Sequence, residues 1–346
     1  MSERGHSPLF ELTRARIREF LREPEAVFWV FAFPVLMTLA LGVAFRNQRP
    51  QDVVVGVLRG DGAAPILATL TAEPGVKASE VAPEDAERVL RTGDVSVLVV
   101  PGDPPAYRFD PARPESRLAR LAVDGALQRA AGRADALTAR EEIVAAPGSR
   151  YIDWLVPGLL GMNIMGTGLW SIGFAVVTAR TRKLLKRLVA TPMPRSSYLL
   201  SHLLARLVFL ALEVGAILVF ARIVFGVRSA GSVWAVGVLC LLGALAFSGL
   251  GLLVASRART IEAVSGLMNV VMLPMWLLSG VFFASSHFPD VAQPFIRALP
   301  LTALNDALRG VMLEGRPIAG VARETATLAA WGLASFAAAL KLFQWR

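Results

Sequence analysis

Residues 26–45 read AVFWVFAFPVLMTLALGVAF, a run of twenty residues without a charged side chain. As an α-helix, about 20 apolar residues are long enough to cross the hydrocarbon core of a bilayer. The chain of 346 residues is 54% hydrophobic and only 18% charged, whereas soluble domains carry about 25% charged residues. Five further long apolar stretches lie at residues 154–178, 202–225, 233–255, 263–283 and 325–343. Together these runs predict an α-helical polytopic membrane protein with six transmembrane helices, of which residues 26–45 form the first.

The flanks of these runs set their orientation. Five arginines precede the first run, and the link between the second and third runs carries six Lys or Arg side chains and no acid. The link after the fourth run (Arg257, Arg259) and the tail (Lys341, Arg346) are basic as well. Short basic flanks stay on the cytoplasmic side. We therefore expect a multi-pass protein with both termini in the cytoplasm. The excess of positive side chains, a net charge of +9, then lies at the inner face of the membrane. This location argues against nucleic acid as a partner.

Residues 1–25 precede the first run and are amphipathic. Phe10, Ile17 and Leu21 share one helical face, while Arg16 and Glu19 lie on the opposite side of the helix. This pattern predicts a cytoplasmic amphipathic helix at the membrane interface. A plain solvated helix is the alternative.

Residues 46–150 have the composition of an ordinary soluble domain, with 14 Lys or Arg and 15 Asp or Glu. Strands are expected at residues 53–58, 95–100 and 106–109, and helices at residues 63–70, 83–92 and 113–131. Leu118, Leu121 and Ala122 share one face of the last helix. Alternating strands and helices predict a small α/β domain. Because it follows the first span, we expect it to be extracytoplasmic.

The sequence carries no signature of an enzyme or a metal site. No phosphate-binding GxxxxGK[ST] loop, Gly-x-Ser-x-Gly elbow or HExxH pair occurs. Cys240 is the sole cysteine, and the three histidines lie far apart. We therefore expect no catalytic residue, no metal and no cofactor bound by this chain.

Polar residues inside the predicted spans are candidates for a translocation path, because intramembrane polar groups are costly and often functional. These residues are Asn163, Glu213 and Asn269. For Glu213 the alternative is a structural ion pair, since Arg206 lies two helical turns away on the same face. The small residues Thr167, Ser171, Ala175 and Ala179 recur every four positions and predict a ridge for close helix packing.

Residues 181–191 form a short cytoplasmic loop with the sequence TRKLLKRLVAT, followed by Pro192. An apolar side of three leucines is surrounded by basic side chains, which is typical of a short amphipathic helix that docks on a soluble partner. Passive binding to anionic lipid is the alternative. The candidate docking residues are Arg182, Lys183, Leu184, Leu185, Lys186, Arg187, Leu188, Thr191 and Pro192.

At this loop the chain resembles the membrane subunits of ABC-2 type transporters. The matching pieces are LKRLVATP at residues 185–192, YIDWLVPG at 151–158, LSGVFF at 278–283, LPLT at 299–302 and DALRG at 306–310. The resemblance covers essentially the whole chain and implies a permease in the bacterial cytoplasmic (inner) membrane. Residues 151–346 would hold its transmembrane helices two to six, with an external segment at 285–320. It also implies a separate cytoplasmic ABC ATPase subunit that binds ATP and Mg²⁺, and a second permease copy or paralogue. Residues 181–191 would be the coupling helix on that ATPase.

A domain between the first two spans resembles that of exporters for drugs, antibiotics and other hydrophobic molecules. The resemblance therefore implies that the permease transports a hydrophobic, amphipathic or lipid-like substrate outward. Membrane lipid would surround the permease as a further partner. Two alternatives remain at this point. One is a membrane-anchored receptor that captures a ligand with residues 46–150. The other is an ion-coupled secondary transporter, although the inverted repeats typical of that class are not evident.

Overall fold

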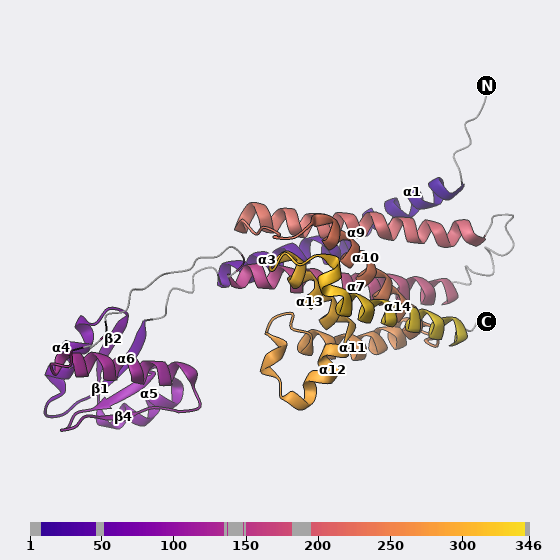
Figure 1. The fold of residues 1–346 in the computed structure, drawn as a ribbon. Coiled ribbons are helices and arrows are strands. Elements are labelled where there is room, and N and C mark those ends of the chain that lie inside the picture. Colours follow the sequence, from indigo (N-terminus) through magenta and orange to yellow (C-terminus); the bar gives the residue numbers. More distant parts are fainter. Residues whose placement is uncertain are drawn as a thin grey trace. The chain divides into compact units, whose positions relative to one another are not determined.

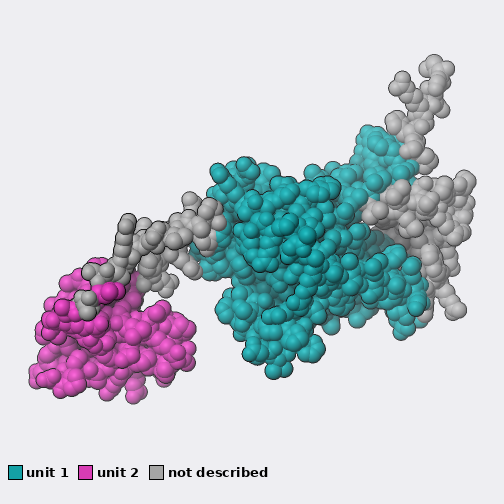
Figure 2. Space-filling view, in the orientation of Figure 1, with its two compact units in different colours: residues 1–46, 145–346 teal, residues 47–144 magenta. Residues whose placement is uncertain are grey.

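The chain folds into two units, which Figure 2 shows in different colours. The first unit holds residues 1–46 and 145–346, and the second holds residues 47–144. The computed structural model describes residues 8–45, 52–134, 137, 148, 150–181 and 195–342. Each unit has a hydrophobic core of its own.

The first unit contains six helical segments that are long and apolar enough to cross a membrane. The segments are Pro24–Ala44, Tyr151–Thr178, Leu204–Phe225, Val233–Ala255, Ile261–Leu278 and Ile318–Leu342. The last five belong to helices α7 (Tyr151–Thr181), α9 (Arg195–Phe225), α10 (Val233–Ala255), α11 (Ile261–Leu278) and α14 (Ala322–Leu342). They confirm the predicted α-helical polytopic membrane fold.

The first span is not a regular α-helix. Between α2 (Pro24–Val27) and α3 (Phe33–Ala44) it widens into a π-helical turn, Phe28–Ala32, where the Phe33 amide bonds to the Phe28 carbonyl. Pro34 follows at once, and it lacks the amide hydrogen that a regular helix would use. A widened turn next to such a proline accommodates the missing hydrogen bond.

Before the first span, the predicted amphipathic segment is a helix, α1 (Pro8–Leu21). It packs against α9, and the ring of Phe20 lies 4.2 Å from that of Phe209 between centroids. The side chains of Phe10 and Leu21 remain exposed. The helix is confirmed, while its place at the membrane interface stays a prediction.

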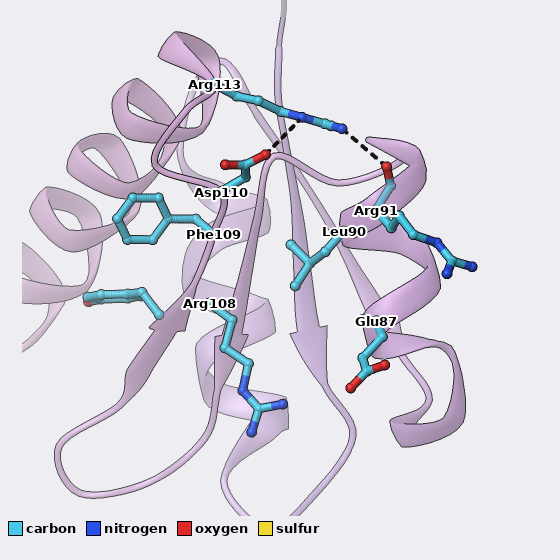
Figure 3. Close-up of a pocket in the computed structure, with 8 residues that line it drawn as sticks. Glu87, Leu90, Arg91, Arg108, Phe109, Asp110 and Arg113 are labelled. Atoms are coloured by element: carbon cyan, nitrogen blue, oxygen red, sulfur yellow. Dashed lines mark hydrogen bonds and ion pairs between the residues drawn. The ribbon is translucent and has the colours of Figure 1, made fainter.

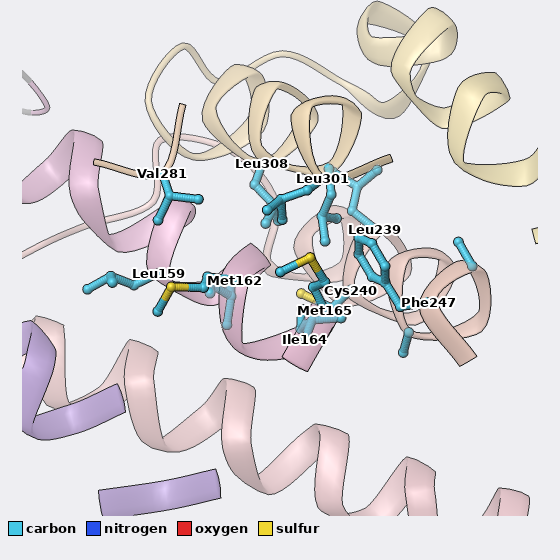
Figure 4. Close-up of a cluster of buried hydrophobic side chains, with 14 of the residues drawn as sticks. Leu159, Met162, Ile164, Met165, Leu239, Cys240, Phe247, Val281, Leu301 and Leu308 are labelled. Atoms are coloured by element: carbon cyan, nitrogen blue, oxygen red, sulfur yellow. The ribbon is translucent and has the colours of Figure 1, made fainter. Parts of the chain in front are cut away.

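The centre of the first unit is α10, which packs against α7 and α14 (Figure 1). A shorter helix, α13 (Pro300–Met312), completes this core, and eleven of its thirteen residues are buried. At about 1.5 Å per residue it is too short to cross a bilayer. Figure 4 shows Leu301 and Leu308 of α13 above Leu239 and Phe247 of α10 and the methionines of α7. The segment expected to be external thus contributes a buried helix to the core.

The second unit is a four-stranded sheet with helices on both faces (Figure 1). The strand order is β2 (Val76–Val81), β1 (Val53–Leu58), β3 (Val97–Val100), β4 (Ala106–Arg108). The first three strands are parallel, with Val53 opposite Val76 and Val55 opposite Val97, whereas β4 is antiparallel to β3. Helices α4 (Ala63–Ala72) and α6 (Pro114–Ala130) cover one face, and α5 (Ala86–Thr92) covers the other.

The sequence pattern did not predict β2, and the expected buried face of α6 was wrong. The residues that pack α6 onto the sheet are Ser116, Ala119, Val123 and Ala126. Leu118 and Leu121 are 66% and 59% exposed, and Ala122 is exposed too, so the predicted apolar face points away from the sheet. Small side chains bring α6 close to the strands, and this close approach fixes its rotation.

Candidate functional site

Two charged side chains of α9 meet inside the third span. Glu213 is 1% exposed, and its Oε1 lies 3.1 Å from Nη2 of Arg206. Seven residues separate the two, so they lie about two turns apart on one face. The ion pair that the sequence allowed as an alternative for Glu213 is therefore formed.

Helix α7 supplies the other partners of this carboxylate. Asn163 donates from Nδ2 to Glu213 Oε2 at 3.5 Å, and Arg206 donates from Nη2 to Thr167 Oγ1 at 2.7 Å. The Thr167 hydroxyl also lies 3.2 Å from Glu213 Oε1 and 2.9 Å from the Asn163 carbonyl, and its one hydrogen serves one of these acceptors at a time. We call these four residues, Asn163, Thr167, Arg206 and Glu213, the α7–α9 polar cluster.

Glu213 and Asn163 are buried, and Thr167 and Arg206 are mostly buried, which makes the hydrogen bonds of this cluster costly to break. Removing one member of a buried ion pair leaves an uncompensated charge and costs about 3–5 kcal/mol. Arg206 Nε has no hydrogen-bond partner among the described residues. The cluster thus holds α7 to α9 at one place near the middle of both spans.

Asn269, the third candidate for a translocation path, is not part of this cluster. It lies on an exposed face of α11, while the neighbouring Met268 and Met272 are buried in the core. The structure therefore brings together two of the three predicted path residues.

The predicted coupling residues, Arg182 to Pro192, lie outside the described residues. The structure does describe both helices that flank them, α7 before and α9 after. At the end of α7, Arg180 donates from Nη1 to the carbonyls of Ala255 and Ala258 at 3.3 and 2.6 Å. Ala255 ends α10 and Ala258 lies just beyond it, and a cation is favoured at such a helix C-terminus. Arg180 therefore fastens the end of α7 to the end of α10.

A second set of contacts joins α13 to the first turn of α7 and to the segment that follows α11. The Arg309 guanidinium lies 3.8 Å above the Trp154 ring and donates from Nη2 to the Gly280 carbonyl. Asn305 donates from Nδ2 to the Ser279 carbonyl at 2.9 Å. Gly280 has φ +68°, a left-handed conformation that suits glycine after a helix end. A structural role for Arg309 could not be predicted from the sequence, because its partners come from distant segments.

The second unit has an open pocket of about 580 Å³ beside β4 (Figure 3). Leu90 and Phe109 line it, together with Arg108 and Arg113. Arg113 closes one end by an ion pair with Asp110 and a hydrogen bond of 3.1 Å to the Arg91 carbonyl. The short α5 leaves this corner of the sheet uncovered, which creates the pocket.

Comparisons with known proteins show what the membrane unit is similar to. A family model described as ABC-2 type transporter matches residues 120–313, more than half of the chain. ABC transporter G family member 20 of Dictyostelium discoideum is 25% identical over 178 residues, which cover 51% of this chain and 24% of that protein. Nodulation protein J of Bradyrhizobium diazoefficiens is 34% identical over 105 residues, 30% of this chain and 40% of that protein.

The inner membrane transport permease YadH of Escherichia coli is 26% identical over 166 residues, 47% of this chain and 63% of YadH. The matches thus span between about a quarter and under two thirds of the length of these relatives. The matched region contains the α7–α9 polar cluster, the loop between the two helices and α13. By this match and by its six candidate spans, the chain belongs to the ABC-2 type transporter family and is a multi-pass membrane permease.

Proposed function

We propose that this permease is the membrane subunit of an ATP-driven exporter that moves a hydrophobic or amphipathic molecule outward. In this proposal a separate cytoplasmic ABC ATPase binds ATP and Mg²⁺, and a second permease, a copy or a paralogue, completes the complex. Both termini lie in the cytoplasm, and residues 46–150 lie outside it. Family membership supports the class, and the lack of a phosphate-binding loop in the sequence supports a separate ATPase.

The observation that carries the proposal is the arrangement around residues 182–194. The two helices that flank this segment are joined to each other by the α7–α9 polar cluster. The first of them is also fastened to α10 through Arg180. A force applied to the segment would therefore act on three spans together. Coupling to an ATPase requires such a connection, because nucleotide must change the relative stability of two conformations of the permease.

Co-purification of the permease with its partner ATPase tests the docking role of the loop. Burying a leucine contributes roughly 1.5–3 kcal/mol, so Leu184→Asp or Leu188→Asp should weaken the complex more than tenfold. Replacing Lys186 and Arg187 with alanine should weaken it less and in a salt-dependent way, as charges at the rim of an interface do. Leu137→Asp in the second unit is the matched control, because this leucine is 82% exposed. The docking role is wrong if both loop variants retain the ATPase as the control does.

Transport into inside-out vesicles tests direction and energy source. The proposal predicts uptake of a hydrophobic dye that requires ATP hydrolysis and persists when a protonophore removes the proton gradient. Uptake that follows the gradient and ignores ATP would identify a secondary transporter. Dye binding to the isolated segment 47–144 without any uptake would favour the receptor alternative.

A further inference from the structure

A pocket of about 680 Å³ lies between α12 (Gln293–Ala298) and α14 in the first unit. Its lining includes Asp290, Arg297, Arg323 and Trp331. These residues are separate from the α7–α9 polar cluster and from the segment 182–194. The transport proposal therefore does not use this pocket.

The charges in this pocket are not neutralised by one another. Arg297 comes from α12 and Arg323 from the first turn of α14, so two separate elements each present one guanidinium. In the part of this unit that the structure describes, the ion pairs within 4 Å use other side chains than Arg297, Arg323 and Asp290. Arg297 also interacts electrostatically with the nearby Asp306 carboxylate. Two exposed cations and one exposed carboxylate therefore line the pocket without a direct ion pair between them.

Neighbouring apolar side chains would suit a position of this pocket at a membrane surface. Val291 and Phe295 lie four residues apart and are 84% and 76% exposed. Large exposed apolar groups on a short helix beside a span are typical of a segment that dips into the headgroup region of a bilayer. The Trp331 indole donates to the Ala298 carbonyl at 2.7 Å, and tryptophan is enriched at the same depth. The charged lining and the exposed apolar groups thus lie side by side, as the two ends of a lipid molecule do.

We propose that this pocket binds a phospholipid with an amine in its headgroup. Arg297 and Arg323 hold the phosphate, because a guanidinium forms paired, charge-assisted hydrogen bonds with phosphate oxygens. Asp290 takes the ammonium group, and the acyl chains lie against Phe295 and the apolar surface of α14. The lipid stays bound to the permease, and its binding requires neither ATP nor a partner subunit.

Native mass spectrometry of the purified permease tests this site with three probes: phosphatidylethanolamine, phosphatidylglycerol and inorganic phosphate. The double variant Arg297→Gln/Arg323→Gln should retain about tenfold less of either lipid than the wild type. Asp290→Asn should reduce binding of phosphatidylethanolamine and leave phosphatidylglycerol unchanged. Arg228→Gln is the matched control, because it removes another exposed arginine of this unit that does not line the pocket.

A double lysine variant, Arg297→Lys/Arg323→Lys, keeps the charge and should recover part of the binding, which separates loss of the site from loss of folding. Lipid retention equal to the wild type in the double glutamine variant would overturn the proposal. Displacement of the lipid by millimolar inorganic phosphate would also overturn it, because the site would then recognise phosphate alone. A shift in oligomeric mass with unchanged lipid would show that a second copy of the chain occupies the pocket. None of these outcomes depends on transport, so failure here leaves the proposed function untouched.

Discussion

Glu213 illustrates how a carboxylate is kept inside an apolar helix. Its two oxygens are reached by Arg206 of the same helix and by Asn163 and Thr167 of α7. The spacing of Arg206 and Glu213 could be recognised in the sequence, because seven residues bring two side chains to one helix face. The two partners on α7 could not, since tertiary packing alone brings them there. Arg180 and Arg309 were missed for the same reason, as both bond to distant carbonyls.

At Glu213 we predict that removing every acceptor for Arg206 is more damaging than removing the negative charge alone. Glu213→Leu leaves Arg206 buried without its partner and should cost about 3–5 kcal/mol of unfolding free energy. Glu213→Gln should be milder, because its amide oxygen still accepts a hydrogen bond from Arg206. The double variant Arg206→Leu/Glu213→Leu should recover much of the loss. Thermal unfolding in detergent measures all four proteins, and a single leucine variant that melts like the wild type would show that the pair does not stabilise the fold.

A second prediction at this scale concerns Tyr107 in the second unit. Burial, together with a hydrogen bond of 3.1 Å to the Asp124 carboxylate, raises the pKa of its phenol to about 12. A pKa raised by folding means that the contribution to stability is present below about pH 10, the pKa of an unperturbed tyrosine, and is lost as the pH rises toward 12. Tyr107 is the sole tyrosine of residues 47–144, and this segment has no tryptophan.

Absorbance of tyrosinate in the isolated segment 47–144 therefore reports this titration directly. We expect the wild type to titrate near pH 12, and Asp124→Asn to titrate at a lower pH because the charged acceptor is lost. Titration of the folded wild type near pH 10 would contradict the contact. Circular dichroism of the same sample checks that the segment folds on its own.

At the scale of elements, the long apolar runs were sufficient to predict the six spans, because a bilayer imposes a length on each. Rotation of the helices about their axes was harder to predict. The small-residue ridge of α7 was expected to pack, yet Ser171 on that ridge is exposed. The closest contacts are made by glycines instead, and a Cβ on Gly168 would lie 2.8 Å from Phe247 Cβ. β2 was missed because it is an edge strand whose residues are mostly not fully buried, so it lacks a continuous apolar run.

The glycine contacts give a prediction for α7. A Cβ on Gly161 would clash with Asn305 Oδ1, whereas a Cβ on Gly166 would meet nothing closer than 3.9 Å. Gly161→Ala should therefore force α13 away from α7 and lower the melting temperature. Gly166→Ala should be neutral or slightly stabilising, because alanine is the better helix former by about 1 kcal/mol. Equal melting temperatures for the two variants would mean that α7 and α13 do not pack this closely.

At the scale of the whole molecule, the chain combines a membrane unit with a sheet unit inserted after the first span. The charge distribution predicts that the sheet unit lies outside the cytoplasm. A cysteine introduced at Asp103, which is exposed, should react with a membrane-impermeant maleimide in intact spheroplasts. Cys240 is buried, and the parent protein measures its background labelling. If Asp103→Cys is labelled only after the inner membrane is disrupted, the sheet unit lies in the cytoplasm and the predicted topology is wrong.

In the proposed function, the loop between α7 and α9 transmits the work of an ATPase to the spans. The most direct test is the rate of ATP hydrolysis by the partner ATPase in proteoliposomes, measured alone, with the permease, and with the Leu184→Asp/Leu188→Asp permease. The account predicts that the wild-type permease changes the rate and that the double variant returns it to the value of the ATPase alone. Equal rates in all three samples, with both permeases inserted and folded, would contradict it.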